Sequence, residues 1–459
     1  MFLTSRRFLM IAIISSFALV VGACDSSGGA SSTTTAGDGP GTTGASTATT
    51  VAPISTIPPD SIPGTNSDSI SPEVAAQMRT DIGVIMLQVE ETRGLPFLEI
   101  PTVTILDEAA FTARVSSDLD EELDPDEVAG QEAMFNLLGM LDPDVDLYEL
   151  LVSLYTEQVA GFYDLDTKEM VVPVSVDGIT ALQELTISHE LVHALTDQHF
   201  DIGDTYTDLV DNGTQDDASA MLGLVEGDAT YQQFLFLESW GPLKATQAAF
   251  EALTIDTTVL DSVPTWMQQD LAFPYEQGLI FTTYLMDESG LKGVDAAYQD
   301  PPLSTEQILD PNKYLRGETP AALAPLTVTL DGWEVFEEAT LGEWGIRMLL
   351  TDTLRPGERN QAAAGWGNDT YRFFLNGADS VFVWSYLGES VPDAEDLSNA
   401  LIAHARDTMG ATGAEESGGG IEFGGGSPYV FVDRIDDAIF FIASTDPVAG
   451  ADIREQLGL

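Results

Sequence analysis

The stretch TISHELVHAL, residues 186–195, contains the spacing His-Glu-x-x-His inside an apolar run of helical periodicity. We predict a helix over Ala181–Asp197 around it. In such a helix His189 and His193 lie one turn apart on the same face, where two imidazoles can bind one zinc ion. Glu190 is rotated by about 100° around the helix. Its carboxylate can therefore approach a zinc-bound water as general base without ligating the metal.

The composition of the chain argues against an ordinary core helix whose histidines only make hydrogen bonds. The chain has four histidines, and three of them, His189, His193 and His199, lie within eleven residues. No charged residue interrupts positions 186–188 or the Leu-Val pair between the first two histidines. The sequence therefore predicts a metal site on this helix.

The motif resembles the zincin metallopeptidases, and more narrowly the gluzincins. A gluzincin takes its third zinc ligand from a Glu on a second, downstream helix. The resemblance thus implies Glu226, in GLVEGDATY (223–231), on a helix that we predict over Asp217–Leu237. It covers roughly Thr156–Tyr231, and over most of Leu95–Tyr314 the chain looks similar to bacterial proteins of this zincin type. It implies a zinc peptidase but no particular substrate.

His199 is the alternative third ligand. It follows His193 by six residues, the spacing of the metzincin pattern His-Glu-x-x-His-x-x-Gly-x-x-His. That pattern needs Gly where this chain has Thr196, because the helix breaks there at a residue that tolerates positive φ. A β-branched residue is disfavoured in that conformation. We therefore favour Glu226 and keep His199 as the rival.

The N-terminus predicts an exported lipoprotein. Residues 1–23 read as a signal peptide, with two arginines followed by an apolar core at 8–21. The tetrapeptide VGAC at 21–24 resembles a bacterial lipobox. Cys24 is the only cysteine, which excludes intramolecular disulfides and fits a lipidated mature N-terminus. We expect a protein anchored to the cell membrane on its extracytoplasmic face, exported by the general or the twin-arginine route.

Composition divides the remaining chain into a tether and a body. Residues 24–71 are almost all Ser, Thr, Gly, Ala and Pro, which predicts a disordered tether. The formal net charge is −58, so nucleic acid and anionic membrane surfaces are unlikely partners. The expected partners are a peptide or protein substrate and, through Cys24, the membrane. A monomer is the default.

The predicted fold class is α+β. Residues 72–325 are expected to form a mainly helical, zincin-like metallopeptidase domain with a small edge sheet, and residues 326–459 a C-terminal α+β subdomain. A hairpin around Asp164–Lys168 precedes the site helix, and Pro173 implies that its second strand is a sheet edge. Such an edge is a candidate for aligning an extended substrate.

Other segments carry weaker signals. Phe200–Asp217 reads as a surface loop, Gly365–Asp369 as a turn and Glu415–Ser427 as a flexible connector. His404 reads as a surface residue. Asp197 and Asp228 are candidates to accept a hydrogen bond from a ligand imidazole. Candidates to stabilise an oxyanion are Tyr163, Tyr231, Tyr275 and Tyr314, which the sequence does not rank.

The sequence therefore predicts a zinc peptidase with His189, His193 and Glu226 as ligands and Glu190 as general base. The alternative is a catalytically inactive zincin-fold lipoprotein that acts as a peptide-binding scaffold in the envelope. The retained Glu190 argues against that alternative, because a scaffold has no need of this carboxylate. Endopeptidase and exopeptidase action both remain open.

Overall fold

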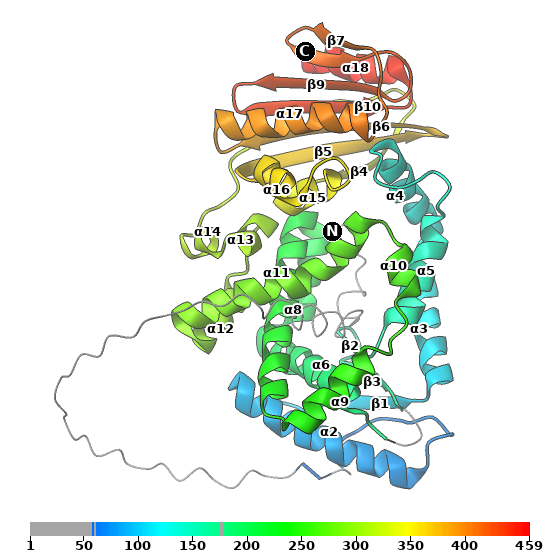
Figure 1. Ribbon diagram of the computed structural model, residues 1–459, viewed down its shortest axis with the longest axis vertical. Coiled ribbons are helices and arrows are strands. Elements are labelled where there is room, and N and C mark those ends of the chain that lie inside the picture. The colour runs from blue at the N-terminus through cyan, green and yellow to red at the C-terminus, as the bar shows by residue number, and fades with distance from the viewer. Residues whose placement is uncertain (1–56, 59–60, 175–177) are drawn as a thin grey trace, which may run out of the picture.

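The computed structural model describes residues 57–58, 61–174 and 178–459. The predicted signal peptide, Cys24 and most of the predicted tether lie outside the described residues. In the described part the chain forms a helical region and a separate antiparallel sheet, which stands at one end of the molecule (Figure 1). The mixed α and β class predicted from the sequence is confirmed at this level. None of the described helices is long and apolar enough to cross a membrane.

Local sequence signals set the ends of the helices. α2 begins after Ser71, whose side chain accepts a hydrogen bond from Val74 N, and ends at Gly94 in the left-handed conformation. The helices before the sheet are α2 (Pro72–Arg93), α3 (Glu108–Glu122), α4 (Pro125–Leu137), α5 (Leu147–Gln158), α6 (Ala181–Phe200), α7 (Ile202–Asn212), α8 (Gln215–Glu238), α9 (Pro242–Ala252), α10 (Thr258–Ser262), α11 (Thr265–Ser289), α12 (Leu291–Gln299), α13 (Thr305–Leu309) and α14 (Pro311–Leu315).

A three-stranded sheet lies beside the predicted site helix. β3 (Glu169–Pro173) is its central strand, with β1 (Thr102–Leu106) parallel on one side and β2 (Phe162–Asp164) antiparallel on the other. β2 and β3 form the predicted hairpin, but the prediction that Pro173 marks an edge is wrong. Pro173 pairs with Leu106 and lies beyond the end of β2, so β2 does not need the missing N–H. The edge strand of the hairpin is β2.

The body begins before the predicted tether boundary at Ser71. Pro63 and Thr65 accept backbone hydrogen bonds of 2.8 and 3.0 Å from residues of β1. Ile62 and Ile70 are buried in the core. Two isoleucines and a strand edge are thus enough to fix a segment whose other residues are mostly small and polar.

The two helices predicted around His189 and Glu226 are confirmed as α6 and α8. The prediction of a surface loop between these two helices is wrong, because the segment contains α7. Ile202 and Tyr206 are buried on one face of α7, and the aspartates that suggested a loop occupy its other face. The amphipathic spacing therefore outweighs the polar composition.

α8 and α11 cross at glycines. A Cβ added at Gly227 would clash with the backbone of Gly278, and one added at Gly278 would clash with the backbone of Gly223. The two helices can approach this closely only because these positions lack side chains. Gly227 directly follows Glu226, so the crossing fixes where Glu226 lies.

The C-terminal region is a seven-stranded antiparallel sheet in the order β4-β5-β6-β10-β9-β8-β7. Along β6, Phe382 and Trp384 face the core that is shared with the helical region, and Val381 and Val383 face a smaller core under α18. Its elements are β4 (Glu334–Ala339), α15 (Gly342–Leu349), α16 (Pro356–Ala363), β5 (Trp366–Asn376), β6 (Asp379–Gly388), α17 (Val391–Asp407), β7 (Ala414–Ser417), β8 (Gly420–Phe423), β9 (Tyr429–Ile435), β10 (Ala438–Ser444) and α18 (Pro447–Leu457).

Two loop predictions in this region are wrong. The predicted turn at Gly365–Asp369 is the start of β5, where a bulge lies between Trp366 and Asn368. The predicted connector at Glu415–Ser427 contains the hairpin of β7 and β8. Glycine there supplies the left-handed turn between two paired strands, so its abundance marks a hairpin and not an unstructured link.

The prediction that His404 is a surface residue is also wrong. His404 is fully buried on α17, on the same stripe as Leu397 and Leu401. Its Nε2 lies 2.9 Å from the backbone oxygen of Leu138, and its Nδ1 lies 2.7 Å from Thr353 Oγ1. His404 therefore joins the C-terminal helix α17 to the turn after α4.

Candidate metal centre

α6 holds the His-Glu-x-x-His motif in the interior. The helix starts with a capping box, in which Thr180 and Gln183 each bond the backbone of the other, and ends at Asp201 in the left-handed conformation. Every residue from Leu185 to Asp197 is buried. The motif is thus held on a helix with fixed ends and no exposed face at the site.

The structure brings the three predicted ligands together. His189 Nε2 lies 2.9 Å and His193 Nε2 lies 3.5 Å from the same oxygen of Glu226, Oε2. The three residues are 0%, 1% and 1% exposed. Two imidazole nitrogens and a carboxylate oxygen that converge from two helices make a donor set that suits zinc.

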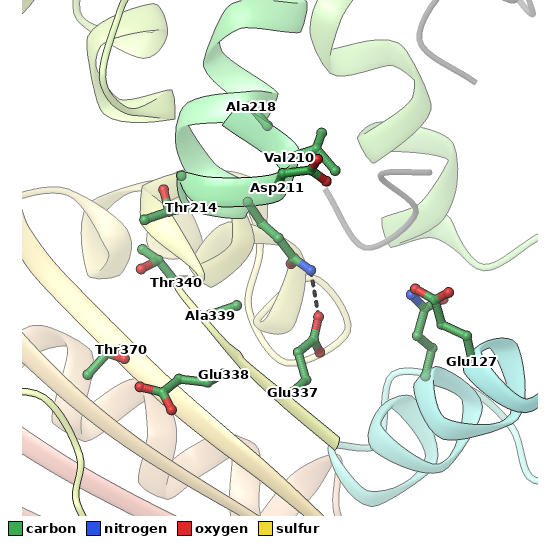
Figure 2. A pocket seen from close by; sticks show the side chains of 13 residues that line it. Glu127, Val210, Asp211, Thr214, Ala218, Glu337, Glu338, Ala339, Thr340 and Thr370 are labelled. Carbon is green, nitrogen blue, oxygen red and sulfur yellow. Dashed lines mark hydrogen bonds between the residues drawn. The ribbon is translucent and has the colours of Figure 1, made fainter. Parts of the chain in front are cut away.

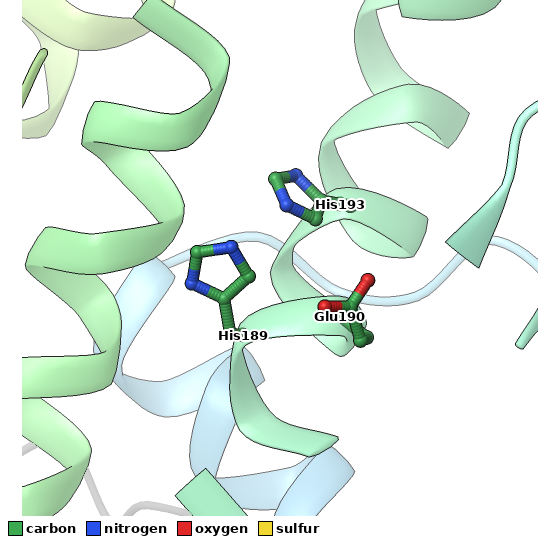
Figure 3. Close-up of side chains that lie close together, drawn as sticks. All are labelled: His189, Glu190 and His193. Carbon is green, nitrogen blue, oxygen red and sulfur yellow. The ribbon is translucent and has the colours of Figure 1, made fainter. Parts of the chain in front are cut away.

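Glu190 lies beside this group on the same helix (Figure 3). Its Oε2 accepts a hydrogen bond of 2.9 Å from the backbone N–H of Tyr163 on β2. Its Oε1 is buried and has no hydrogen-bond partner among the described residues. Ligand atoms of His189, Glu190 and His193 all lie within 4.8 Å of one another. One oxygen of the Glu190 carboxylate is therefore held by a hydrogen bond, and the other is free beside the candidate metal position.

Burial and charge shift the pKa values of these groups in different directions. Burial lowers the pKa of His189, although Glu226 opposes the shift. Burial, followed by the charge of Glu226, raises the pKa of Glu190 well above its usual range. Burial alone would raise the pKa of Glu226, but His193 and His189 outweigh it and lower that pKa to about 2. Glu226 is therefore the carboxylate of this group that stays ionised.

His199 does not join the group. Its Nε2 lies 2.8 Å from the backbone oxygen of Pro96, and its side chain is partly exposed at the end of α6. α6 continues without a break through Thr196, whose side chain bonds back to the backbone oxygen of Val192. Without the break, His199 is not turned back toward the two motif histidines.

The two aspartates considered as partners of the imidazoles bond elsewhere. Asp197 accepts hydrogen bonds from Tyr163 OH (3.0 Å) and Lys168 Nζ (2.7 Å). Asp228 accepts a bond of 2.9 Å from Arg93 Nε and one of 3.2 Å from Tyr298 OH. The Nδ1 atoms of both motif histidines are buried without a partner in the described part of the chain.

Arg93 is a residue of this neighbourhood that the sequence analysis missed. It is 1% exposed and forms ion pairs with Asp228 (2.9 Å) and Asp295 (2.7 Å). A signal for it exists in the sequence, since Arg93 lies four residues after Val89 on the apolar stripe of α2. A charge on a buried stripe indicates a buried partner. The pair holds α2 against α8, two residues from Glu226.

Of the four candidate tyrosines, Tyr275 lies against the motif. Its ring centroid is 6.1 Å from that of His189, and burial followed by the charges of Glu226 and Glu190 raises its pKa well above the usual range. Tyr163 contributes its backbone N–H to Glu190, and its hydroxyl bonds Asp197. Tyr314 OH bonds the backbone oxygen of Asp300.

Two other polar clusters do not match this chemistry. A cavity of about 470 Å³ lies between α4, the start of α8 and β4, and no Lys, Arg or His is among the described residues that line it (Figure 2). Gln215 donates to Glu337 across it. Glu306, Glu318 and Glu389 also converge, but Lys313 Nζ lies within 3.2 Å of all three. An ammonium group thus already occupies the centre of that cluster.

Comparison with known proteins bears on the C-terminal region alone. A family model described as a domain of unknown function (DUF8575) matches residues 332–450, which run from just before β4 into α18. No curated protein and no solved structure matches the chain. α6 and α8 lie outside the matched residues. The candidate metal centre is therefore supported by the geometry of its own residues alone.

Proposed function

We propose that the protein is a zinc-dependent peptidase of the gluzincin type, in which His189, His193 and Glu226 hold the metal. The observation that carries the proposal is the convergence of two Nε2 atoms on Glu226 Oε2, with Glu190 beside them. A bound zinc ion would supply a water of lowered pKa, and thus a nucleophile at neutral pH, and would polarise the carbonyl to be attacked.

The donor groups present fit a zinc ion. The lowered pKa of His189 keeps its nitrogen lone pair free, and the low pKa of Glu226 keeps a negative charge on the shared oxygen. Without a cation, the carboxylate of Glu226 is buried beside the Nε2 atoms of His189 and His193 with no metal ion to neutralise it. A divalent cation bound there would neutralise the site and lower the free-energy cost of burying it.

Glu190 is the proposed general base. The N–H of Tyr163 holds Oε2, so Oε1 is the oxygen left to accept a proton from the attacking water and to pass it to the leaving amine. Tyr275 is the proposed donor to the developing oxyanion. Its raised pKa keeps the phenol protonated at neutral pH, which a hydrogen-bond donor requires.

The location is proposed from the sequence. Residues 1–23 are the proposed signal peptide and Cys24 the proposed lipid-bearing residue, which would hold the enzyme outside the cytoplasmic membrane. The body would then act on peptides or proteins of the envelope or its surroundings.

One observation favours the second candidate function, a zincin-fold scaffold without activity. All four site residues are at most 1% exposed, which is typical of a structural metal site and demands an opening before a peptide can reach Glu190. Glu190 has one hydrogen-bonded oxygen and one free oxygen, which favours the enzyme. A structural metal site has no use for a free, buried carboxylate oxygen.

Hydrolysis of an unstructured protein separates the two functions. The zinc-loaded protein is compared with Glu190→Gln, which keeps all three proposed ligands. A peptidase predicts cleavage that the variant loses by at least about a hundredfold while its zinc content is unchanged. Equal cleavage by both proteins contradicts the assigned base, and zinc binding without cleavage by the unmutated protein contradicts the enzyme and favours the scaffold.

A further inference from the structure

The outer face of α9 carries large apolar side chains in water. Leu243 and Phe250 are 85% and 68% exposed, and Leu253, just after the helix, is 73% exposed. Spacings of seven and three residues place them on one side of the helix. Ala248 and Ala252 on the opposite side are buried. We call the three exposed residues the α9 ridge.

Few charged residues lie near the α9 ridge along the chain, in a sequence with 75 acidic residues. Residues 239–255 include two charged side chains, Lys244, which is 40% exposed, and Glu251, and the exposed Glu238 and Asp256 flank this segment. Lys244 pairs with Glu184 and lies 4.2 Å from the ring centroid of Trp240. Glu251 accepts a hydrogen bond of 2.8 Å from the first turn of α6. The α9 ridge is thus an apolar patch on a strongly acidic molecule, and such patches are typical of surfaces that contact another apolar surface.

The α9 ridge lies at the end of the body where the N-terminal chain joins it. Ile57 packs against α2 at Gly83, where an added Cβ would lie 3.2 Å from the backbone oxygen of Ile57. α2 and α9 both pack on α6. Both stand at the end opposite the seven-stranded sheet (Figure 1). Thirty-two residues lie between Cys24 and Ile57, so the chain that carries the proposed anchor joins the body at this end of the molecule.

We propose that the α9 ridge rests on the lipid bilayer that holds the N-terminus, with Leu243, Phe250 and Leu253 at the boundary between headgroups and acyl chains. The inference rests on the proposed membrane anchor and is independent of the peptidase activity. Three side chains do not offset the entropy of capturing a free protein. The anchor makes the contact intramolecular, so a weak insertion is enough.

The negative charge of the body favours a lipid bilayer over a second copy of the chain as the partner of the α9 ridge. Two bodies of net charge −58 repel each other, and the same repulsion disfavours anionic lipid. A zwitterionic lipid surface carries no net charge and accepts apolar side chains. The contact would set the orientation of the body, with the seven-stranded sheet pointing away from the membrane.

The sole cysteine allows a direct test. The full chain with Cys24→Ser keeps residues 8–21 as its membrane-binding segment, and a polarity-sensitive dye is attached at Phe250→Cys. The control carries the dye at Val448→Cys, a position 78% exposed on α18 at the other end. Flotation with phosphatidylcholine vesicles shows that the chain is membrane-bound, and an aqueous quencher then reports exposure of the dye.

The proposal predicts a blue-shifted dye at position 250, several-fold less quenched on vesicles than in solution, and no change at position 448. Leu243→Ser with Leu253→Ser should restore quenching at position 250, and anionic lipid should weaken the shielding until salt is added. Equal quenching at both positions on floating protein overturns it. A chain that does not float also overturns the proposal. Shielding that occurs without vesicles and rises with protein concentration overturns it too, because it indicates contact with a second copy of the chain. Hydrolysis by the same samples is scored separately.

Discussion

Two buried carboxylates, one in each region, are treated in opposite ways. In the sheet region Asp369 is 1% exposed and accepts four hydrogen bonds of 2.6–2.9 Å, from the backbone of Leu341 and Gly342 and from the indoles of Trp366 and Trp384. These donors tie the start of α15 to β5 and β6. Every lone pair that points inward has a partner, which is how a buried charge contributes to a stable fold.

In the helical region Glu190 is equally buried and has one hydrogen bond, from Tyr163 N. Its second oxygen and the Nδ1 atoms of His189 and His193 lack partners in the described structure. Burial raises the pKa of both Asp369 and Glu190. The difference teaches that completeness of the network, and not burial, separates a structural carboxylate from one held ready for a ligand.

The sheet region also holds the site helices in place. Asp216, at the start of α8, accepts hydrogen bonds of 2.6 and 3.1 Å from Thr305, and Thr305 Oγ1 accepts one of 3.1 Å from Trp344 N on α15. The indole of Trp344 donates to Asp270 on α11 at 2.8 Å. α8 carries Glu226 and α11 carries Tyr275. The hydrogen-bond network around α15 therefore helps to position the candidate metal centre.

The largest expected effect comes from breaking the complete network. Asp369→Ala leaves two indole and two backbone N–H groups buried without partners, which should lower the free energy of unfolding by about 4 kcal/mol or more. Urea unfolding measures it. The matched control, Asp379→Ala at the exposed first residue of β6, should change stability by at most about 0.5 kcal/mol. Similar losses in the two variants would contradict the role given to Asp369.

Zinc held by His189, His193 and Glu226 should stabilise the helical region. Zinc at about a thousand times its dissociation constant should raise the free energy of unfolding by about 4 kcal/mol, and a chelator should remove that gain. The gain should persist in Glu190→Gln and disappear in His193→Ala. Urea unfolding with and without zinc measures it, and a gain that His193→Ala retains would place the metal elsewhere.

His404 should make stability depend on pH. Burial lowers its folded pKa to about 4, against about 6.5 when unfolded. The unfolded chain therefore binds the proton first on acidification, so this stabilisation is present above about pH 6.5 and is lost as the pH falls through about 4. The loss from pH 7 to pH 4 should be roughly 3 kcal/mol larger in the unmutated chain than in His404→Gln. Parallel pH profiles of unfolding in the two proteins would refute this assignment.

The smallest expected change in stability tests the helix crossing. Gly227→Ala places a methyl group against the backbone of Gly278, which should lower the free energy of unfolding by about 1–3 kcal/mol and weaken zinc binding, because Glu226 moves with α8. Gly357→Ala in α16 meets nothing within 4 Å and should be neutral or up to about 1 kcal/mol stabilising, with zinc binding unchanged. Unfolding and zinc titration measure both. Unchanged zinc affinity in Gly227→Ala would mean that the crossing does not position Glu226.

Local signals in the sequence were enough for the helices and hairpins that carry their own caps and periodicity. Ser71 and Gly94 bound α2, and Thr180 opens α6. These elements are specified by residues within a turn of their ends, so the chain alone predicts them. The placement of Glu226 could be anticipated only through the resemblance to gluzincins, because the convergence of α6 and α8 depends on a distant crossing with α11.

The errors arise where tertiary packing outweighs local composition. α7 contains acidic and small residues that suggest a loop, but Ile202 and Tyr206 anchor it to the core. His404 is followed in sequence by the polar residues Arg406 and Asp407, and its partner Leu138 lies in another region of the chain. Arg93 lies on the apolar stripe of α2 and Tyr275 is a candidate from the sequence, but their partners are far away in sequence and no local pattern identifies them.

Zinc content per chain, measured by mass spectrometry after dialysis against buffered zinc, tests the central claim most directly. The unmutated protein is compared with Glu226→Ala and with His199→Ala as the matched control. The account predicts one zinc per chain in the unmutated protein and in His199→Ala, and a loss in Glu226→Ala, because Glu226 Oε2 is the atom on which both imidazoles converge. Zinc retained by Glu226→Ala and lost by His199→Ala would contradict it.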